Sequence, residues 1–325
     1  MNRSSLLLCA FLAGCGKGGG KDNENNDMGV STDAAVIGDA GGDQGVDDFP
    51  AVPTTPGLHA LDFIHDGAPR TLLVYLPADY THTDTRPLFV ALHGGGGSAQ
   101  QMFDQHGLAE AADETGYIFV AAQGLPKPGG GGNEWNGYLA FDNGGDDVGY
   151  LERLFLGLSA GLKIDPTRRY LAGFSGGATM TVRFATEKSE LLAAIGTFAG
   201  KVGRSTDDSP DNFVFPPAPT TPLAVQMVYG TEDGNYDGEL KDGILSTGGR
   251  VGLEWWADTL GCGATPTTAP MGRITLDTWT GCEGGVVVQM VTVDGMGHTW
   301  PDKGDETNLD GTKLQLDFFE GKVKP

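Results

Sequence analysis

From residue 57 onward, short apolar runs alternate with segments of helical periodicity, and this alternation limits the possible folds more than any other feature. The runs PLFVALHG at 87–94 and YIFVAAQG at 117–124 are apolar almost throughout, as is typical of strands buried on both faces. Helical spacing is clearest in Leu151, Leu154, Phe155, Leu158 and Leu162. The pattern predicts the α/β class, with a mostly parallel central sheet flanked by helices.

The expected elements continue this alternation to the end of the chain. Strands are expected in two places within 61–80, as a leading pair, and then at 87–94, 117–124, 168–175, 192–200, 222–230 and 286–295. Helices are expected at 98–115, from Asp146 and Asp147 through Leu162, at 176–188, at 253–260 and at 313–319. One domain over 57–325, about 270 residues long, accommodates all of them.

Charge and hydropathy exclude several classes of partner. The formal net charge of −22 argues against a nucleic-acid-binding surface, which needs clustered lysine and arginine to neutralise phosphates. Downstream of the N-terminus, no run approaches the roughly 20 apolar residues that span a bilayer. We therefore expect a body that binds no nucleic acid and contacts a membrane only through its N-terminus.

The N-terminal segment has the pattern of an export signal. Arg3 precedes the apolar run 6–12, and small residues lead to Cys15 in the sequence LAGC, which resembles a bacterial lipobox. We therefore expect a lipoprotein signal peptide at 1–14 and lipidation of Cys15, with the protein anchored to the cell envelope or secreted. The alternative is an ordinary cleaved signal with an incidental cysteine. Residues 15–56 are rich in glycine, aspartate and asparagine, which predicts a disordered tether.

Two cysteines remain once the export segment is set aside. Cys262 and Cys282 would share an oxidising compartment, which favours a disulfide between them. A zinc site is the alternative, but two cysteines without a nearby histidine make a poor ligand set.

The sequence GFSGGATM places Ser175 in a Gly-x-Ser-x-Gly motif. With 53 glycines and ten serines in 325 residues, about 0.27 accidental matches are expected, so the motif alone is weak. Its context strengthens it, because an expected strand precedes Ser175 and an expected helix follows. A nucleophile elbow requires this arrangement, in which a tight turn lifts the serine hydroxyl above the sheet.

A nucleophilic serine needs a base and an acid that orients the base. Of six histidines only His298 follows Ser175, and it lies just after the expected strand 286–295. The loop after strand 222–230 offers four carboxylates, Glu232, Asp233, Asp237 and Glu239. Asp233 comes soonest after the strand and its turn, which makes it the expected acid. A calcium loop is the rival interpretation, because Asp233, Asn235, Asp237 and Gly238 match its start. Ile244 stands where that loop needs a bidentate glutamate.

A glycine run, HGGGG at 93–97, follows the strand 87–94. Glycines there would let backbone amides approach a substrate carbonyl, and we expect an oxyanion hole from the amides of Gly95 and Gly176. The alternatives are a mobile glycine hinge, or donation from another glycine of the run.

The motifs together resemble the secreted polyhydroxybutyrate depolymerase and feruloyl esterase group of α/β-hydrolases, which includes carbohydrate esterases. The resemblance covers most of 60–320 and rests on YLPADY, LHGGGGSA, EWNGY, DDVGYLERL, YLAGFSGGATMT, YGTED, WWADTLGC and GMGHTWP. Gly176 departs from the asparagine common after the nucleophile. GNYDGE after the acid and the loop 125–145 depart as well, which leaves the substrate open.

The resemblance implies an exported serine esterase that works through an acyl-serine intermediate without a cofactor or metal. Ser175, Asp233 and His298 match the group's triad, and Cys262 with Cys282 matches a frequent bridge. Candidate substrates are polyhydroxyalkanoate oligomers, hydroxycinnamoyl esters of plant cell-wall sugars and acetylated xylan. We also expect Trp135 and Trp300 to form an aromatic wall for substrate, with plain packing as the alternative. The competing function is a surface lipoprotein that keeps the hydrolase fold but binds without cutting.

Overall fold

The computed structural model describes residues 49–137, 144–205, 209, 212–238, 240–241, 244–304 and 307–325. The expected signal at 1–14, the lipidation of Cys15 and most of the tether at 15–56 lie outside these residues. Among the described residues, no helix combines the length and the apolar character needed to cross a bilayer.

The elements follow one another as β1 (Gly57–His65), β2 (Ala68–Leu76), β3 (Arg86–Leu92), α1 (Ala99–Gln105), α2 (Leu108–Thr115), β4 (Ile118–Ala122), β5 (Leu125–Pro126), β6 (Asn133–Glu134), α3 (Asp147–Gly161), β7 (Ile164–Phe174), α4 (Gly176–Glu187), η2 (Ser189–Leu191), β8 (Ala194–Phe198), β9 (Arg204–Ser205), β10 (Phe213–Val214), β11 (Ala224–Gly230), α5 (Gly234–Asp237), β12 (Leu240–Lys241), β13 (Ile244–Leu245), α6 (Gly249–Thr259), β14 (Thr267–Met271), β15 (Ile274–Trp279), η3 (Glu283–Gly285), β16 (Val288–Val293) and α7 (Gly311–Phe319).

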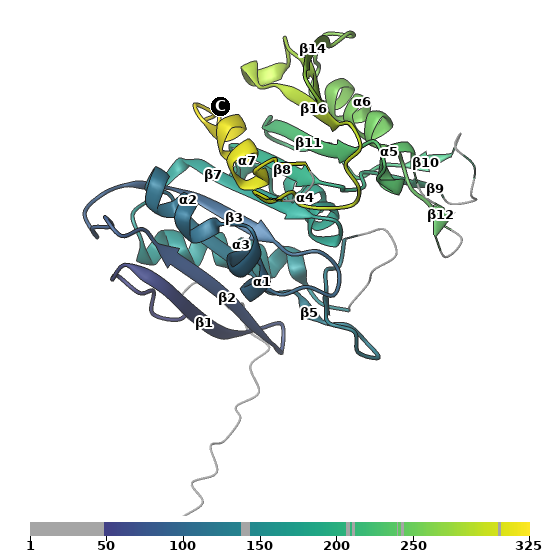
Figure 1. Ribbon diagram of the computed structural model, residues 1–325. Coiled ribbons are helices and arrows are strands. Elements are labelled where there is room, and N and C mark those ends of the chain that lie inside the picture. The colour runs from purple at the N-terminus through teal and green to yellow at the C-terminus, as the bar shows by residue number, and fades with distance from the viewer. Residues whose placement is uncertain are drawn as a thin grey trace, which may run out of the picture. The chain divides into compact units, whose positions relative to one another are not determined.

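One large sheet organises the described part of the chain (Figure 1). Its ten strands lie in the order β1-β2-β4-β3-β7-β8-β11-β16-β15-β14. The six central strands, β4 to β16 in this order, are parallel, and the strands at both edges are antiparallel. The prediction of a mostly parallel sheet flanked by helices is therefore confirmed.

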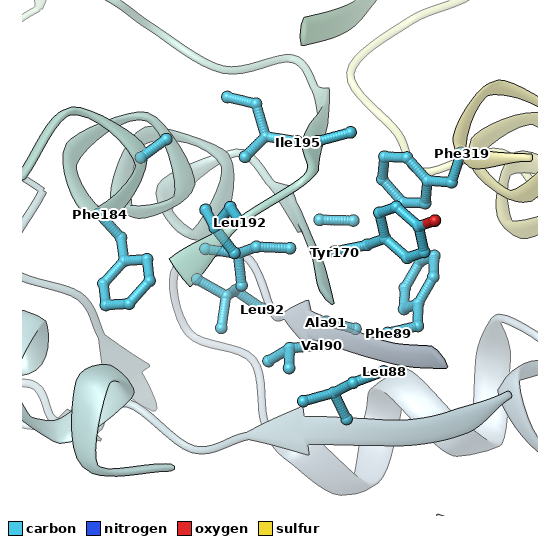
Figure 2. Close-up of a cluster of buried hydrophobic side chains, with 14 of the residues drawn as sticks. Leu88, Phe89, Val90, Ala91, Leu92, Tyr170, Phe184, Leu192, Ile195 and Phe319 are labelled. Atoms are coloured by element: carbon cyan, nitrogen blue, oxygen red, sulfur yellow. The ribbon is translucent and has the colours of Figure 1, made fainter. Parts of the chain in front are cut away.

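The central strands are buried on both faces, because helices cover both sides of a parallel sheet. Every residue of β4, β8 and β11 is buried, as is all of β3 after its first residue. Figure 2 shows part of this core, with Phe184 of α4 and Phe319 of α7 on opposite sides of a cluster that includes residues 88–92 of β3. The rings of Phe89 and Tyr170 lie 5.5 Å and 4.6 Å from that of Phe319.

Three local features differ from the sequence-based expectations. The single helix expected at 98–115 is two helices, because Gly107 adopts a left-handed conformation with φ 60° between α1 and α2. The antiparallel hairpin β14–β15 was not expected, since every residue of β14 is exposed and the segment lacks an apolar alternation. Residues 49–56, which the sequence assigns to the tether, include Phe49, whose ring lies 5.0 Å from that of Phe63.

The direction of the parallel strands places several loops together. Ser175 follows β7, Asp233 follows β11, His298 follows β16, and the glycine run 94–97 follows β3. All four strands point the same way, so these segments leave the sheet at its carboxyl edge, where open α/β sheets bind their ligands.

Candidate active site

Ser175 lies in a sharp turn between β7 and α4. Its φ and ψ of 52° and −111° are outside the regions that a residue with a Cβ ordinarily occupies. A backbone hydrogen bond from Ser175 N to Phe198 O, 2.9 Å long, holds the turn against β8. Such a conformation costs about 1–3 kcal/mol and persists only where the surroundings enforce it, which is common at functional sites.

The two glycines of the motif are required by close backbone packing. A Cβ on Gly173 would lie 2.7 Å from the amide nitrogen of Ala178 and would clash with Gly177 O. A Cβ on Gly177 would lie 2.5 Å from Leu92 O and would clash with His93 O. These distances are below any normal contact of a side chain, so the Gly-x-Ser-x-Gly pattern reflects the approach of α4 to β3 and β7.

His298 connects Ser175 to Asp233. Its Nε2 lies 2.9 Å from Ser175 Oγ, and its Nδ1 lies 3.0 Å from Asp233 Oδ1. The Asp233 side chain is 2% exposed and the His298 side chain 42% exposed. With Nδ1–H donating to the carboxylate, Nε2 is left to accept the serine proton, as a general base requires. The structure thus brings together the three residues that the sequence singled out.

Asp233 differs in its burial from two carboxylates close to it in the sequence. Glu232 and Asp237 are exposed, whereas Asp233 is buried and also accepts a 2.9 Å hydrogen bond from the amide of Asn235. The side-chain amide of Asn235 donates to Ala199 O at 2.8 Å, so two residues of the calcium-loop pattern have other partners. Among the described residues, no group of three or more histidine, cysteine, aspartate or glutamate side chains could hold a metal ion.

A small pocket opens beside Ser175. Its volume is about 220 Å³, and it is lined by Gly95, Gly96, Lys127, Gly131, Glu134, Ser175 and Gly176. Gly176 is the first residue of α4, where amide groups have no partner within the helix. The amide nitrogen of Gly95 would be 3.3 Å from a Cβ on Gly176, so the two expected oxyanion donors lie close together.

His93 and Asn133 hold the glycine run in place, and neither was among the residues predicted for the site. Nδ1 of His93 donates to Gly94 O at 2.8 Å, and its Nε2 accepts from the amide of Gly124 at 3.0 Å. Burial lowers the pKa of His93 from 6.5 to about 4, so the ring is neutral at physiological pH. Asn133 O accepts from Gly96 N, and Asn133 Nδ2 donates to Gly97 O at 2.7 Å. The position of His93 directly before four glycines was the available signal.

Trp135 and Trp300 do not form the expected aromatic wall. Each is only 1% exposed. Trp135 Nε1 donates to His93 O at 2.9 Å, and the ring of Trp300 lies 4.6 Å from Phe198. The expectation is corrected, because both indoles pack behind the loops of the site and present no face to a bound substrate.

Cys262 and Cys282 are joined by a disulfide in the structure. The bond connects the segment after α6 to the segment after β15. This pair therefore stabilises the region of the antiparallel edge strands and takes no part in the geometry around Ser175.

Comparisons with known proteins add relatives and a shared fold. No protein-family model matches the chain. The putative esterase NocK of Nocardia uniformis subsp. tsuyamanensis is 29% identical over 252 residues, which cover 66% of each protein. Feruloyl esterase B of Piromyces equi is 27% identical over 237 residues, covering 70% of this chain and 42% of that enzyme. The chain thus spans less than two thirds of the length of these curated relatives.

Among solved structures, the acetyl xylan esterase from Aspergillus awamori matches with a TM-score of 0.58 at 17% identity. The match covers 81% of this chain and 99% of that structure. At this identity the likeness concerns the fold alone, and it confirms the fold expected from the sequence.

Proposed function

We propose that this chain, which is similar to feruloyl and acetylxylan esterases, hydrolyses carboxylic esters with Ser175 as the nucleophile. One observation carries the proposal. Ser175 Oγ, His298 and Asp233 form a continuous chain of hydrogen bonds of 2.9 Å and 3.0 Å, at the mouth of a pocket bordered by Gly95 and Gly176.

The reaction proceeds in two halves. His298 Nε2 takes the proton of Ser175 Oγ as the oxygen attacks the ester carbonyl, and the resulting imidazolium is stabilised by the Asp233 carboxylate. The same proton passes to the leaving alcohol when the tetrahedral intermediate collapses to an acyl-serine. A water molecule then gives a proton to His298 and attacks the acyl-serine, which releases the carboxylic acid and restores Ser175.

The oxyanion of each tetrahedral intermediate would accept hydrogen bonds from the amides of Gly95 and Gly176. Both amides are on backbone held in place before substrate arrives, Gly176 by α4 and Gly95 by the contacts of His93 and Asn133. Preorganised donors of this kind are each worth about 3–4 kcal/mol of barrier in serine hydrolases.

The substrate classes we propose are acetyl or hydroxycinnamoyl esters of polysaccharides and oligomers of hydroxyalkanoates. We also propose that the protein is exported, with residues 1–14 as signal and Cys15 as the site of lipid attachment. The Cys262–Cys282 disulfide supports export, since such bonds persist in oxidising compartments.

The test is hydrolysis of a panel by wild type and Ser175→Ala. The panel contains p-nitrophenyl acetate and butyrate, methyl ferulate, acetylated xylan and a hydroxybutyrate trimer. We expect wild type to cleave at least the p-nitrophenyl esters, and Ser175→Ala to reduce turnover by several orders of magnitude. A wild-type protein that cleaves none of them would favour the competing function, a binding protein on a hydrolase fold. An alanine variant with full activity would exclude Ser175 as the nucleophile.

A further inference from the structure

A buried carboxylate, Glu134, borders the same pocket as Ser175. Glu134 is 6% exposed and lies at the end of the short hairpin β5–β6. Its Oε1 would be 2.9 Å from a Cβ on Gly95 and 4.0 Å from a Cβ on Gly176. The carboxylate therefore lies beside both residues whose amides are proposed to receive the oxyanion.

The backbone around Glu134 is fixed from several directions. The preceding residue, Asn133, makes the two contacts with the glycine run described above, and the following residue, Trp135, donates to His93 O. One residue further, the amide of Asn136 donates to Asp147 Oδ2 at 2.6 Å, and Asn136 O accepts from Arg183 Nη1 at 2.7 Å. Glu134 is thus carried on a rigid support, as a residue that discriminates between substrates should be.

The chemistry of a carboxylate restricts what can bind beside it. An ionised carboxylate accepts hydrogen bonds at about four lone-pair sites and donates none, so it has capacity for a substrate donor in addition to partners within the protein. It repels a second negative charge, and it offers no favourable contact to an aliphatic or aromatic surface. A hydroxyl group close to the ester is the donor that fits a pocket of about 220 Å³ lined largely by glycine backbone.

We propose that Glu134 determines specificity by accepting a hydrogen bond from a substrate hydroxyl that lies within a few bonds of the scissile ester. The inference rests on the proposed esterase function and narrows it to hydroxylated esters. The hydroxyl can come from the acyl group, as in a hydroxyalkanoate, or from the alcohol, as in a sugar with a free hydroxyl next to the acylated one.

The experiment compares kcat/KM within two pairs of esters. In the first pair, p-nitrophenyl 3-hydroxybutyrate and p-nitrophenyl butyrate differ by a hydroxyl on the acyl group. In the second pair, 2-hydroxyethyl acetate and 2-methoxyethyl acetate differ in whether the alcohol can donate a hydrogen bond. Wild type, Glu134→Gln and Glu134→Leu are measured, with Glu320→Gln as the matched control, since Glu320 is exposed and lies just after α7.

We expect wild type to prefer the hydroxylated member of one pair, and that pair identifies the source of the hydroxyl. Glu134→Leu should lower this preference by about 10- to 100-fold, the range for a hydrogen bond to a charged group. Glu134→Gln keeps the shape and one acceptor oxygen, so it should lower the preference less. Glu320→Gln should leave the preference unchanged.

Two results would overturn the proposal. The first is a wild type that shows no preference in either pair. The second is a loss of kcat/KM that is equal for both members of a pair, which would mean that Glu134 only supports the pocket. Thermal melting of each variant shows whether the protein is folded. Hydrolysis of p-nitrophenyl butyrate by wild type and its loss in Ser175→Ala test the esterase function separately, so the two proposals can fail independently.

Discussion

His298 Nε2 lies 2.9 Å from Ser175 Oγ although 123 residues separate the two in the sequence. Each residue is in the loop after its own strand, and β8 and β11 lie between these strands in the sheet. The contact therefore depends on the register of four parallel strands. Asp233 follows β11, the immediate neighbour of β16, and reaches the far nitrogen of the same imidazole.

The choice of Asp233 as the acid can be tested against its neighbour in sequence. If Asp233 has the proposed role, Asp233→Asn removes the charge that stabilises the imidazolium and allows the wrong tautomer, so kcat should fall by roughly 10⁴-fold, as in known serine triads. Asp237 is exposed, and Asp237→Asn should leave kcat within about twofold of wild type. Initial rates on p-nitrophenyl acetate measure both effects. If only Asp237→Asn were inactive, the acid would be Asp237, four positions later in the sequence.

Because α4 lies so close to β3, we expect one methyl group added at Gly177 to lower the free energy of unfolding. In Gly177→Ala the new Cβ meets the carbonyl oxygens of Leu92 and His93, which are fixed by the sheet, so the free energy of unfolding should fall by about 1–3 kcal/mol or more. Gly234→Ala is the matched control, because a Cβ there meets nothing within 4 Å and its φ is not positive. Urea unfolding of the two variants gives the comparison. Equal stabilities would show that the helix can shift away from the sheet.

Burial of His93 predicts a dependence of stability on pH. Between about pH 4 and pH 6.5 the unfolded chain protonates this histidine while the folded protein keeps it neutral. The unfolded state therefore binds more protons in this range, and the free energy of unfolding decreases as pH falls from 6.5 towards 4, by roughly 3 kcal/mol for this one group. Above pH 6.5 the contribution of His93 is fully present.

The measurement is the free energy of unfolding at several pH values for wild type and His93→Asn, which cannot titrate. The wild-type curve should rise more steeply with pH between 4 and 6.5, and the two curves should run parallel above that range. Curves that stay parallel throughout would mean that the folded protein protonates His93 as easily as the unfolded chain does.

The sequence sufficed to select Ser175, His298 and Asp233 because their relation depends on element order. Each follows an apolar run long enough to identify as a strand, and parallel strands bring their carboxyl ends together. The same reasoning missed the break at Gly107, although the spacing of the apolar residues changes there. Phe103 and Leu108 are buried but five residues apart, which would place them on different sides of one continuous helix.

The burial of the two tryptophans could not be predicted from the sequence either. A position close to a loop of the site does not determine on which side of that loop the indole ring lies. Trp135 and Trp300 are both 1% exposed, and their neighbours come from distant segments such as His93 and Phe198. Glu134 is the opposite case, a residue of the pocket that the sequence did not indicate. Charged residues are ordinarily exposed, and nothing in the sequence predicted that this one is buried and borders the pocket.

A buried ion pair between Arg70 and Asp147 anchors the backbone that carries Glu134. Arg70 Nη1 lies 2.6 Å from Asp147 Oδ1, and the two side chains are 1% and 0% exposed. Asp147 also accepts the amide of Asn136. Removing one charge from such a pair leaves the other buried without compensation, so Asp147→Asn should lower the free energy of unfolding by about 3–5 kcal/mol.

Replacing both partners removes both buried charges. The double variant Arg70→Met with Asp147→Asn should therefore be less destabilised than the sum of the single variants, with a coupling of about 0.5–3 kcal/mol. The exposed pair of Arg250 and Glu254, 47% and 54% exposed, is the comparison, and Glu254→Gln should cost less than about 1 kcal/mol. Additive effects at Arg70 and Asp147 would mean that the pair contributes through packing and the bond to Asn136, and that its charges do not depend on each other.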